Sequence, residues 1–567
     1  MNNKLLSFAA AAATLLAFAA CNKDDAPKPD VVTPEMANAY AKVAISMPKV
    51  TRADVTFGDG GYDAGNEAEQ KITDIFLAFY DSFGNYVGKG EMISEILSSK
   101  NGQSDNISNI HTQIFKLSLT EDANEPTQVI AFINTPLVTV KLDNLTTTSD
   151  GTAKVEASEI MNDEKGFAMT NSGYFESDGK YVAASKLEVA LYESEEAAKG
   201  GSTNATIYVE RLASKITVKE KDGGMQEDLN YKVVDIDGKS VSLKFTPSEW
   251  APTGTAKEEN LVKTQFEKEE DWMASTYRSY WAQGVNYNLD FVNYYDKQQT
   301  KPTAKSPLNY VEFSQVGSLY ELGETPQYVP EHTSKLQMGV DENNLPTGME
   351  NIIANTYALV IGKYSVETEG SYEYKNEDDE TDFFLLLTGE NKDGLKTYTI
   401  YNTNQLIALL LKYNGITEVY NDADKSGKVD EEDYSDHFGL NYNSKGQYIL
   451  VFTEELYDQS GNKITLGEDQ IATKSRHYYF ENGAAYFNVP IATNTDDGGV
   501  TTYGVVRNHS YVLTLSKITN LGAPLNGDVF DSTDDPIIPN PDELKDHFIK
   551  AEINVLSWHV VNNGVTL

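Results

Sequence analysis

The chain has 567 residues and a formal net charge of −40, with 23% charged and 40% hydrophobic residues. This length exceeds that of a typical single core, so two or more domains are expected. The strong negative charge argues against nucleic acid or an anionic membrane as a partner, because these polyanions would repel the chain. The 34 tyrosines, against 22 phenylalanines, favour β-strands and contact surfaces over helical bundles.

The first 20 residues have the pattern of an export signal. Lys4 precedes an apolar, alanine-rich stretch, and small residues stand directly before Cys21. Cys21 is the only cysteine, so no internal disulfide can form. Its place after "LAFAA" resembles a bacterial lipobox, in which the thiol is lipidated, although Phe18 stands where leucine is usual. The following "CNKDD" resembles the tag of lipoproteins on the outer face of the outer membrane. We therefore expect a lipid-anchored precursor at the cell surface, with simple secretion as the alternative.

The first strand is predicted in "AYAKVAISM". Ala41, Val43 and Ile45 alternate with more polar or smaller residues, and this period of two indicates a half-buried strand from Tyr40 to Met47. The strand should end at Pro48. Arg52, one of only five arginines, then falls in what should be an exposed loop. We interpret it as a proteolytic cut site, after which Ala53 becomes the first residue.

Short strand-like runs separated by turn signals continue to the C-terminal region. The segment "DIDG" at residues 235–238 predicts a hairpin turn between two alternating strands. The best helical pattern is "NQLIALLLKYNG", with Gly415 as its expected C-terminal cap. Many strands and few helices predict β-sandwiches, and the size of each half places a boundary near residues 205–225.

The last residues combine an extended linker with an apolar strand. "LGAPLNGDVFDSTDDPIIPNPDELKD" is rich in proline and aspartate, which disfavours packing. After it, apolar residues recur at every second position. We predict that this strand inserts into the sheet of another molecule, and its donor residues are Ile553, Val555, Leu556, Trp558 and Val560.

Four segments together resemble the fimbrillins of Bacteroidales, the subunits of type V pili, and most closely the shaft pilin of the minor fimbria. They are the lipoprotein signal with "MPKVTRAD", the strand "TIYVERLASKITV", the run from "YYFENGAAYFNVPI" to "YGVVRNHSYVLTLSKITNLGAP", and the terminal "INVLSWHV". Residues 220–470 match only loosely. The resemblance implies a mainly β fold of two tandem transthyretin-like β-sandwiches.

The implied division of the chain has five parts. Residues 1–20 are the signal peptide, and residues 21–52 are a propeptide with a tether and a self-complementing strand. Residues 53–210 form the N-terminal sandwich, residues 211–530 the C-terminal sandwich with insertions, and residues 531–567 the linker and donor strand.

The resemblance also implies a mechanism of assembly. The subunit folds with its own first strand in a gap of the sheet, and an Arg-specific surface protease cuts after Arg52. A strand from a neighbouring copy then fills the gap by donor-strand exchange. The expected partners are copies of the chain, anchor and tip pilins, and host or bacterial surface ligands, in a fimbrium that supports adhesion and biofilm formation. The alternatives are a surface-anchored glycan-binding lipoprotein of a polysaccharide-uptake system, or an anchor or tip pilin.

Catalytic motifs are not evident in the sequence. The seven histidines are scattered, and no HExxH, Gly-x-Ser-x-Gly, P-loop or Rossmann pattern occurs. With 86 acidic residues, a glycoside hydrolase is not disproved but has no supporting pattern. The expectation is a protein that is not an enzyme and requires no cofactor.

One loop is a candidate for a structural Ca²⁺ site. In "DADKSGKVDEED" the oxygen ligands follow the spacing of an EF-hand loop, with Gly427 at the sharp turn and Val429 at the apolar position. The ligands would be Asp422, Asp424, Ser426, Lys428 through its carbonyl, Asp430 and Asp433. The alternative is a solvated acidic loop, which is common in a chain this acidic.

An aromatic segment lies near the middle of the chain. It contains Trp272, Tyr277, Tyr280, Trp281, Tyr287, Tyr294 and Tyr295. These side chains could stack on sugars, but packing in a core or at a strand edge is the more common use of such residues.

Overall fold

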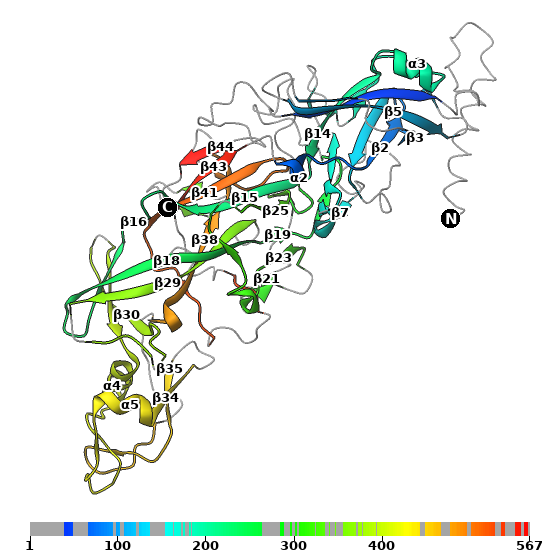
Figure 1. Cartoon of the computed structure of the whole chain (residues 1–567). Helices are drawn as coiled ribbons and strands as arrows, with labels where there is room; N and C mark the ends of the chain where they lie inside the picture. The colour runs from blue at the N-terminus through cyan, green and yellow to red at the C-terminus, as the bar shows by residue number, and fades with distance from the viewer. Residues whose placement is uncertain are drawn as a thin grey trace.

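The computed structural model covers the whole chain and describes the residues that follow. They are 39–48, 66–93, 98–101, 107–120, 124–135, 154–162, 164–171, 174–175, 181–182, 184–263, 284–288, 295–296, 301–302, 306–323, 325–334, 339–340, 346–347, 355–369, 372–376, 378–392, 394–442, 448–466, 477–495, 501–527, 535–538, 550–556 and 561–564. The fold is mainly β, as predicted. Figure 1 shows an elongated arrangement, with β1 to β5 at one end, a larger body in the middle, and α4 and α5 at the other end.

Seven strands of the first body form a closed ring of hydrogen-bonded neighbours, which we call the N-terminal barrel. Each strand of the ring pairs with the next, and the last pairs with the first. In spatial order they are β1 (Tyr40–Pro48), β14 (Ala205–Arg211), β10 (Met169–Asn171), β6 (Gln128–Ile133), β2 (Ile75–Tyr80), β3 (Tyr86–Met92) and β5 (Ile107–Leu119). Two short strands join the outside of the ring, β4 (Ser98–Asn101) on β5 and β13 (Ser185–Lys186) on β6. Phe79, Phe115 and Ile130 are fully buried in its core.

The middle body is a sandwich of two sheets, which we call the C-terminal sandwich. The first sheet contains, in spatial order, β25 (Gln327–Pro330), β15 (Ala213–Glu220), β41 (Ser510–Ile518), β43 (Lys550–Leu556) and β44 (Val561–Gly564), and the short β16 (Gln226–Glu227) also pairs with β41. The second contains, in spatial order, β37 (His477–Phe480), β30 (Phe383–Glu390), β31 (Lys396–Tyr401), β17 (Tyr231–Val234), β18 (Ser240–Thr253), β29 (Tyr357–Thr368), β38 (Ala484–Pro490) and β42 (Ala523–Pro524), and the short β24 (Tyr320–Glu321) also pairs with β18. Side chains of both sheets share one buried core, for example Val218 and Leu513 from the first and Val360 and Phe383 from the second.

Two local predictions are confirmed in this body. β17 and β18 form the hairpin expected at "DIDG", and Gly238 takes a φ of 81°, which L side chains rarely adopt. Helix α4 (Thr403–Tyr413) begins after Asn402, whose side chain accepts a hydrogen bond from the Gln405 N–H while the Gln405 side chain accepts one from the Asn402 N–H. Gly415, just past the helix end, has a φ of 77°.

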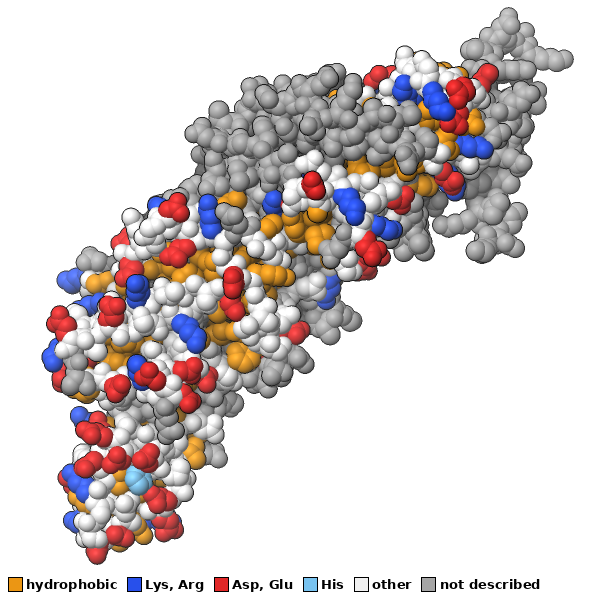
Figure 2. Space-filling model, viewed as in Figure 1, with side chains coloured by type: hydrophobic (Ala, Val, Ile, Leu, Met, Phe, Trp, Pro, Cys, Tyr) orange, Lys and Arg blue, Asp and Glu red, His pale blue; other side chains and the backbone are white. Residues whose placement is uncertain are grey.

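A third, smaller core lies at the far end of the molecule. The chain between β31 and β37 contains α4, α5 (Tyr434–His437), β34 (Phe438–Tyr442) and β35 (Tyr448–Phe452), and we call residues 402–466 the helical lobe. Leu406, Leu410 and Leu450 pack in its core together with Phe384 from β30. Figure 2 shows acidic side chains gathered over this end. The sequence predicts only an insertion here, whereas the structure shows a hydrophobic core built on the sandwich.

Candidate strand-complementation site

Strand β1 closes the N-terminal barrel. It runs antiparallel to β5, with Lys42 opposite Ile114, and parallel to β14, with Val43 opposite Ala205. Apart from β1, the ring contains no described pairing between β5 and β14, so these strands would be the two edges of an open sheet. The segment predicted as a self-complementing strand therefore occupies a slot between two strand edges.

The inner face of β1 is apolar and completely buried. Ala41, Val43 and Ile45 each have a relative exposure of 0% and pack in the core of the barrel. Burial of these three side chains contributes on the order of 5 kcal/mol before ordering costs. Alternation of side chains along a strand explains why this face is recognisable in the sequence.

Asn204, which directly precedes β14, forms hydrogen bonds with the backbone of β1. Its side-chain oxygen accepts a hydrogen bond from the Lys42 N–H at 2.7 Å, and its own N–H donates to the Lys42 carbonyl at 2.7 Å. The Asn204 amide nitrogen donates to the Ala190 carbonyl at 2.6 Å. Asn204 is fully buried. Loss of β1 would leave buried polar atoms of this residue without these partners, which is unfavourable.

The ammonium group of Lys42 lies at the end of a short helix. Lys42 Nζ donates to the carbonyls of Lys199 at 3.3 Å and of Gly201 at 3.1 Å. These carbonyls are at the C-terminal end of α3 (Glu195–Gly200), where unpaired carbonyl groups favour a cation. The slot therefore contacts both the backbone and one outward side chain of its strand.

Most predicted site residues at the two chain ends lie outside the described residues. These are Cys21, Arg52, Ala53, Trp558 and Val560. Lipidation at Cys21 and cleavage after Arg52 stay predictions.

The C-terminal strand lies in its own chain's sheet. β43 runs antiparallel to β41, with Ile553 opposite Leu513, Val555 opposite Tyr511 and Leu556 opposite Ser510. β44 then pairs with the other edge of β43. Donation of this strand to another molecule, as the sequence predicts, requires that β43 first leave β41.

The candidate Ca²⁺ loop is held by its own hydrogen bonds. Asp422 accepts from the Ser426 hydroxyl at 3.0 Å, and Asp424 accepts from the Ser426 N–H at 3.0 Å. Hydrogen bonds from Ser426 lower the pKa of Asp424. The Lys428 ammonium pairs with Glu418 at 3.1 Å.

The backbone of this loop departs from the expected turn. The left-handed residue is Lys425, with a φ of 64°, rather than Gly427. Across the part of the chain that the structure describes, no three His, Cys, Asp or Glu side chains are grouped as a metal site. Ca²⁺ binding by Asp422, Asp424, Ser426, Lys428, Asp430 and Asp433 stays a prediction.

A buried group of charges, which the sequence does not predict, lies where the barrel meets the sandwich. We call it the junction cluster, and it consists of Glu210, Glu259, Lys263, Glu331 and Arg507. Arg507 Nη2 is 2.9 Å from Glu259 and 3.4 Å from Glu331. Lys263 Nζ is 2.9 Å from Glu210.

Burial determines the electrostatics of the junction cluster. It raises the pKa of Glu210 despite the nearby Lys263, and it raises the pKa of Glu259 well above its usual value despite Arg507. Burial alone would lower the pKa of Arg507, but Glu331 and Glu259 outweigh it, so this pKa rises. One signal was available in the sequence: Arg507 is one of only five arginines and directly follows the apolar "GVV".

A second arginine, Arg211, lies beside the junction cluster. Arg211 Nε donates to the Glu69 carbonyl at 2.7 Å, and its Nη1 donates to the Asn508 side chain at 3.3 Å. The segments "VERL" and "VVRN", 297 residues apart, therefore meet at the junction.

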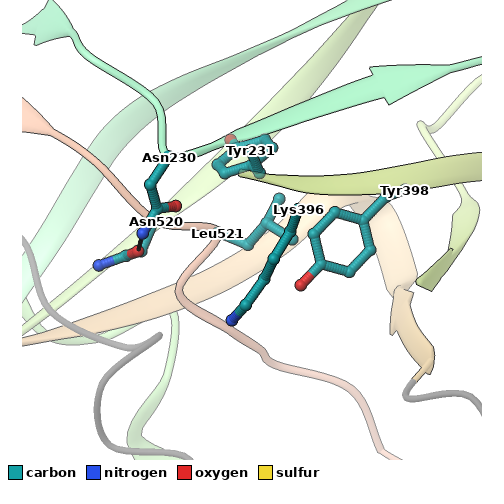
Figure 3. A pocket seen from close by; sticks show the side chains of 6 residues that line it. All are labelled: Asn230, Tyr231, Lys396, Tyr398, Asn520 and Leu521. Carbon is teal, nitrogen blue, oxygen red and sulfur yellow. Dashed lines mark hydrogen bonds between the residues drawn. The ribbon is translucent and has the colours of Figure 1, made fainter. Parts of the chain in front are cut away.

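Figure 3 shows a hollow on the C-terminal sandwich, beside β17 and β31. Its lining residues are Asn230, Tyr231, Lys396, Tyr398, Asn520 and Leu521. Its volume of about 10 Å³ gives room for roughly one water molecule. The Asn230 amide donates to the Asn520 side chain across its rim.

Two further features bear on the class of protein. No helix among the described residues is both long and apolar enough to span a membrane. Of the aromatic segment, the structure describes Tyr287, which is half-buried, and the backbone of Tyr295 in β21 (Tyr295–Asp296). The other five aromatic residues lie outside the described ranges, so a role in sugar stacking stays untested.

Comparison with known proteins identifies the C-terminal part of the chain. Residues 478–564 match the family described as "Major fimbrial subunit protein type IV, Fimbrillin, C-terminal". This part of the chain is similar to the C-terminal region of fimbrillins. The matched fimbrillin segment contains β41 and β43, and it includes Arg507. No curated protein matches the chain.

Solved structures with a distant likeness come from Parabacteroides distasonis and Bacteroides eggerthii. A candidate cell adhesion protein from Parabacteroides distasonis is 12% identical, covers 92% of this chain and 99% of its own, and has a TM-score of 0.34. A fimbrial assembly protein from the same organism is 11% identical, covers 58% of this chain and 98% of its own, with a TM-score of 0.23. A candidate cell adhesion protein from Bacteroides eggerthii is 11% identical, covers 93% and 98%, with a TM-score of 0.26. These TM-scores are too low to support a conclusion about fold or function.

Proposed function

We propose that this chain is a structural subunit of a cell-surface pilus, in which copies are joined by exchange of a β-strand. The fimbrillin C-terminal region supports the class of protein. The observation that carries the proposal is the slot between β5 and β14, which the chain's own β1 fills. A strand that closes a barrel from a terminal segment is replaceable by a strand of the same pattern from another copy.

Assembly in this proposal begins with a lipoprotein precursor. The precursor is anchored through Cys21 at the outer membrane, and an Arg-specific protease cuts after Arg52, leaving Ala53 as the first residue. The cut separates β1 from the rest of the barrel, because Arg52 lies four positions after Pro48, the last residue of β1. The C-terminal strand of the next copy then enters the slot. The subunit acts as a building element rather than an enzyme, in a fimbrium that also contains anchor and tip pilins and supports adhesion.

Before the cut, the covalent link protects the slot. β1 is present at a high effective concentration, so a strand from another copy cannot compete with it. After the cut, β1 becomes a separate peptide, and a donor strand present on every copy can replace it.

The test compares Arg52→Ala with Lys49→Ala after treatment with an Arg-specific protease. Wild type and Lys49→Ala should lose residues 1–52 and form a ladder of heat-sensitive multimers on unboiled gels. Arg52→Ala should remain a folded monomer that keeps its N-terminal segment. The proposal fails if Arg52→Ala forms the ladder as readily as wild type, or if the mature wild-type protein retains a lipidated Cys21, which would favour an anchored binding protein.

A further inference from the structure

The slot restricts how an incoming strand can lie, because its inner positions are buried and its outer position faces α3. This inference rests on the proposed function and concerns the register of the donor strand. A shift by one residue would exchange the buried and exposed faces, so only shifts by two need comparison. The inner positions are those of Ala41, Val43 and Ile45, all fully buried.

Three registers place alternate residues between Ile549 and Ser557 toward the core. The first places Ala551, Ile553 and Val555 at the three inner positions. The second places Ile549, Ala551 and Ile553 there, which adds three carbons at the position of Ala41 and removes two at that of Val43. The third places Ser557 at the position of Ile45, where its hydroxyl would be buried in an apolar core.

The volume of the side chains at the three inner positions distinguishes the three registers. The first register keeps alanine at the first inner position and merely exchanges isoleucine and valine at the other two, so the total volume is unchanged. Volume-conserving exchanges are tolerated better than an overpacked position combined with a cavity. We propose that the donor strand of the next copy enters parallel to β14 with Ala551, Ile553 and Val555 in the places of Ala41, Val43 and Ile45.

This register has a consequence on the outer face. Glu552 takes the place of Lys42, whose ammonium donates to the carbonyls of Lys199 and Gly201. The backbone contacts with Asn204 are retained, because they involve only the N–H and carbonyl of the strand. The carboxylate of Glu552, however, faces carbonyl oxygens at the C-terminal end of α3, which disfavour an anion.

The other charges on α3 do not reverse this mismatch. Lys199 pairs with Glu195 at 2.8 Å and with Glu196 at 3.0 Å. Its ammonium is therefore already engaged by two carboxylates. The apolar face of the donor strand thus matches the slot, but the strand lacks the cation that β1 supplies. We therefore expect β1 to bind the slot more tightly than the donor strand does.

Cysteine pairs test the register directly. Thr112 on β5 lies opposite Ala44, a half-buried outward position of β1. In the proposed register Asn554 takes the place of Ala44, whereas in the second register Glu552 does. In a full-length Cys21→Ser background cut after Arg52, Thr112→Cys with Asn554→Cys should give disulfide-linked multimers on boiled, non-reducing gels. Thr112→Cys with Glu552→Cys should not.

The outcomes separate the register from the proposed function. Multimers linked through position 552 but not 554 would overturn the register and leave strand exchange intact. Heat-sensitive multimers without either disulfide would mean that the third register, the opposite strand direction or another segment fills the slot. This outcome would also overturn the register. Absence of heat-sensitive multimers from cleaved wild type would instead refute the proposed function.

A charge reversal provides a second, independent readout. Glu552→Lys should restore the contacts of Lys42 and slow multimer dissociation by about three- to ten-fold at low ionic strength. Asn554→Lys is the matched control, because it changes the net charge in the same direction on the same strand but takes the place of Ala44, two residues along from the position of Lys42. Equal stabilisation by both variants would show a general charge effect and contradict the inference.

Discussion

A single histidine illustrates how burial sets the response of the protein to acid. His332 is fully buried, and its Nδ1–H donates to the Gly254 carbonyl at 3.0 Å. Burial lowers the pKa of His332 to about 4. In the unfolded chain an imidazole has a pKa of about 6.5, so between these values the unfolded state binds a proton that the folded state does not. The stability of the folded state is therefore lost as pH falls through this window.

We expect this histidine to make the protein sensitive to mild acid. Lowering the pH from 7 to 5 should reduce the free energy of unfolding by about 2 kcal/mol through His332 alone. His332→Asn keeps an N–H donor but does not titrate, so its free energy of unfolding should lack this part of the pH dependence. Urea titrations of both proteins at the two pH values measure the difference. Identical pH dependence in the two proteins would contradict the assignment.

Residues of this kind are hard to predict from sequence. Spacing in the sequence tests the histidines only as metal ligands or catalytic groups. His332 meets Gly254 and Thr356, which are 78 and 24 residues away. The junction cluster also depends on contacts between residues far apart in the sequence. Glu210 and Arg507 become neighbours only when two distant strands come together. The local sequence around each of these residues does not predict which distant residue it will contact.

At the level of elements, the sequence predicts those strands, turns and helices whose formation depends on neighbouring residues. β1 was predicted because its apolar residues alternate, and the hairpin at residues 235–238 because its turn chemistry is specific. Helix α4 was predicted because apolar spacing and a terminal glycine coincide. The core of the helical lobe was not predicted, because its members, such as Leu386, Val429 and Ile464, come from separate short elements.

The acidic loop of the helical lobe gives a prediction at the same scale. If Asp422 and Asp424 bind Ca²⁺, their carboxylates must exchange the hydrogen bonds from Ser426 for the cation. Millimolar Ca²⁺ should then raise the melting temperature of the wild type relative to chelator. The double variant Asp422→Ala and Asp424→Ala should lose this increase without losing polymerisation.

Two comparisons control for general ion effects. Mg²⁺ at the same concentration should stabilise less, because it prefers a smaller octahedral site. Glu454→Ala and Glu455→Ala remove two negative charges elsewhere in the helical lobe and should keep the Ca²⁺ response. A wild-type melting temperature that is equal in Ca²⁺ and chelator would mean that the loop is only a solvated turn.

For the whole molecule, the junction cluster connects the two β bodies through buried charges. Glu210 lies on β14 of the N-terminal barrel, whereas Arg507 lies three residues before the start of β41 of the C-terminal sandwich. Arg507 also donates to the Asn260 carbonyl at 2.7 Å. Removing this guanidinium would leave Glu259 and Glu331 buried without their cation.

We expect Arg507→Leu to destabilise the protein by about 3–5 kcal/mol, as is typical when one partner of a buried ion pair is removed. Adding Glu259→Gln should recover part of this loss, because it removes one uncompensated charge. Urea unfolding of the single and double variants gives the coupling free energy between the two positions. Additive effects of the two substitutions would contradict a direct interaction. Lys244→Leu, at an exposed position of β18, is the control for loss of a basic residue.

One covalent feature gives the molecule a mechanical property. β14 ends at Arg211 and β15 begins at Ala213, so a single residue connects a barrel strand to a sandwich strand. β14 pairs parallel with the strand in the slot, and β15 pairs parallel with β41. In a fibre of such subunits, a pulling force would enter through the slot and leave through the C-terminal strand. It would load both ladders along their length, so that several hydrogen bonds resist together and the fibre withstands traction rather than unzipping one bond at a time.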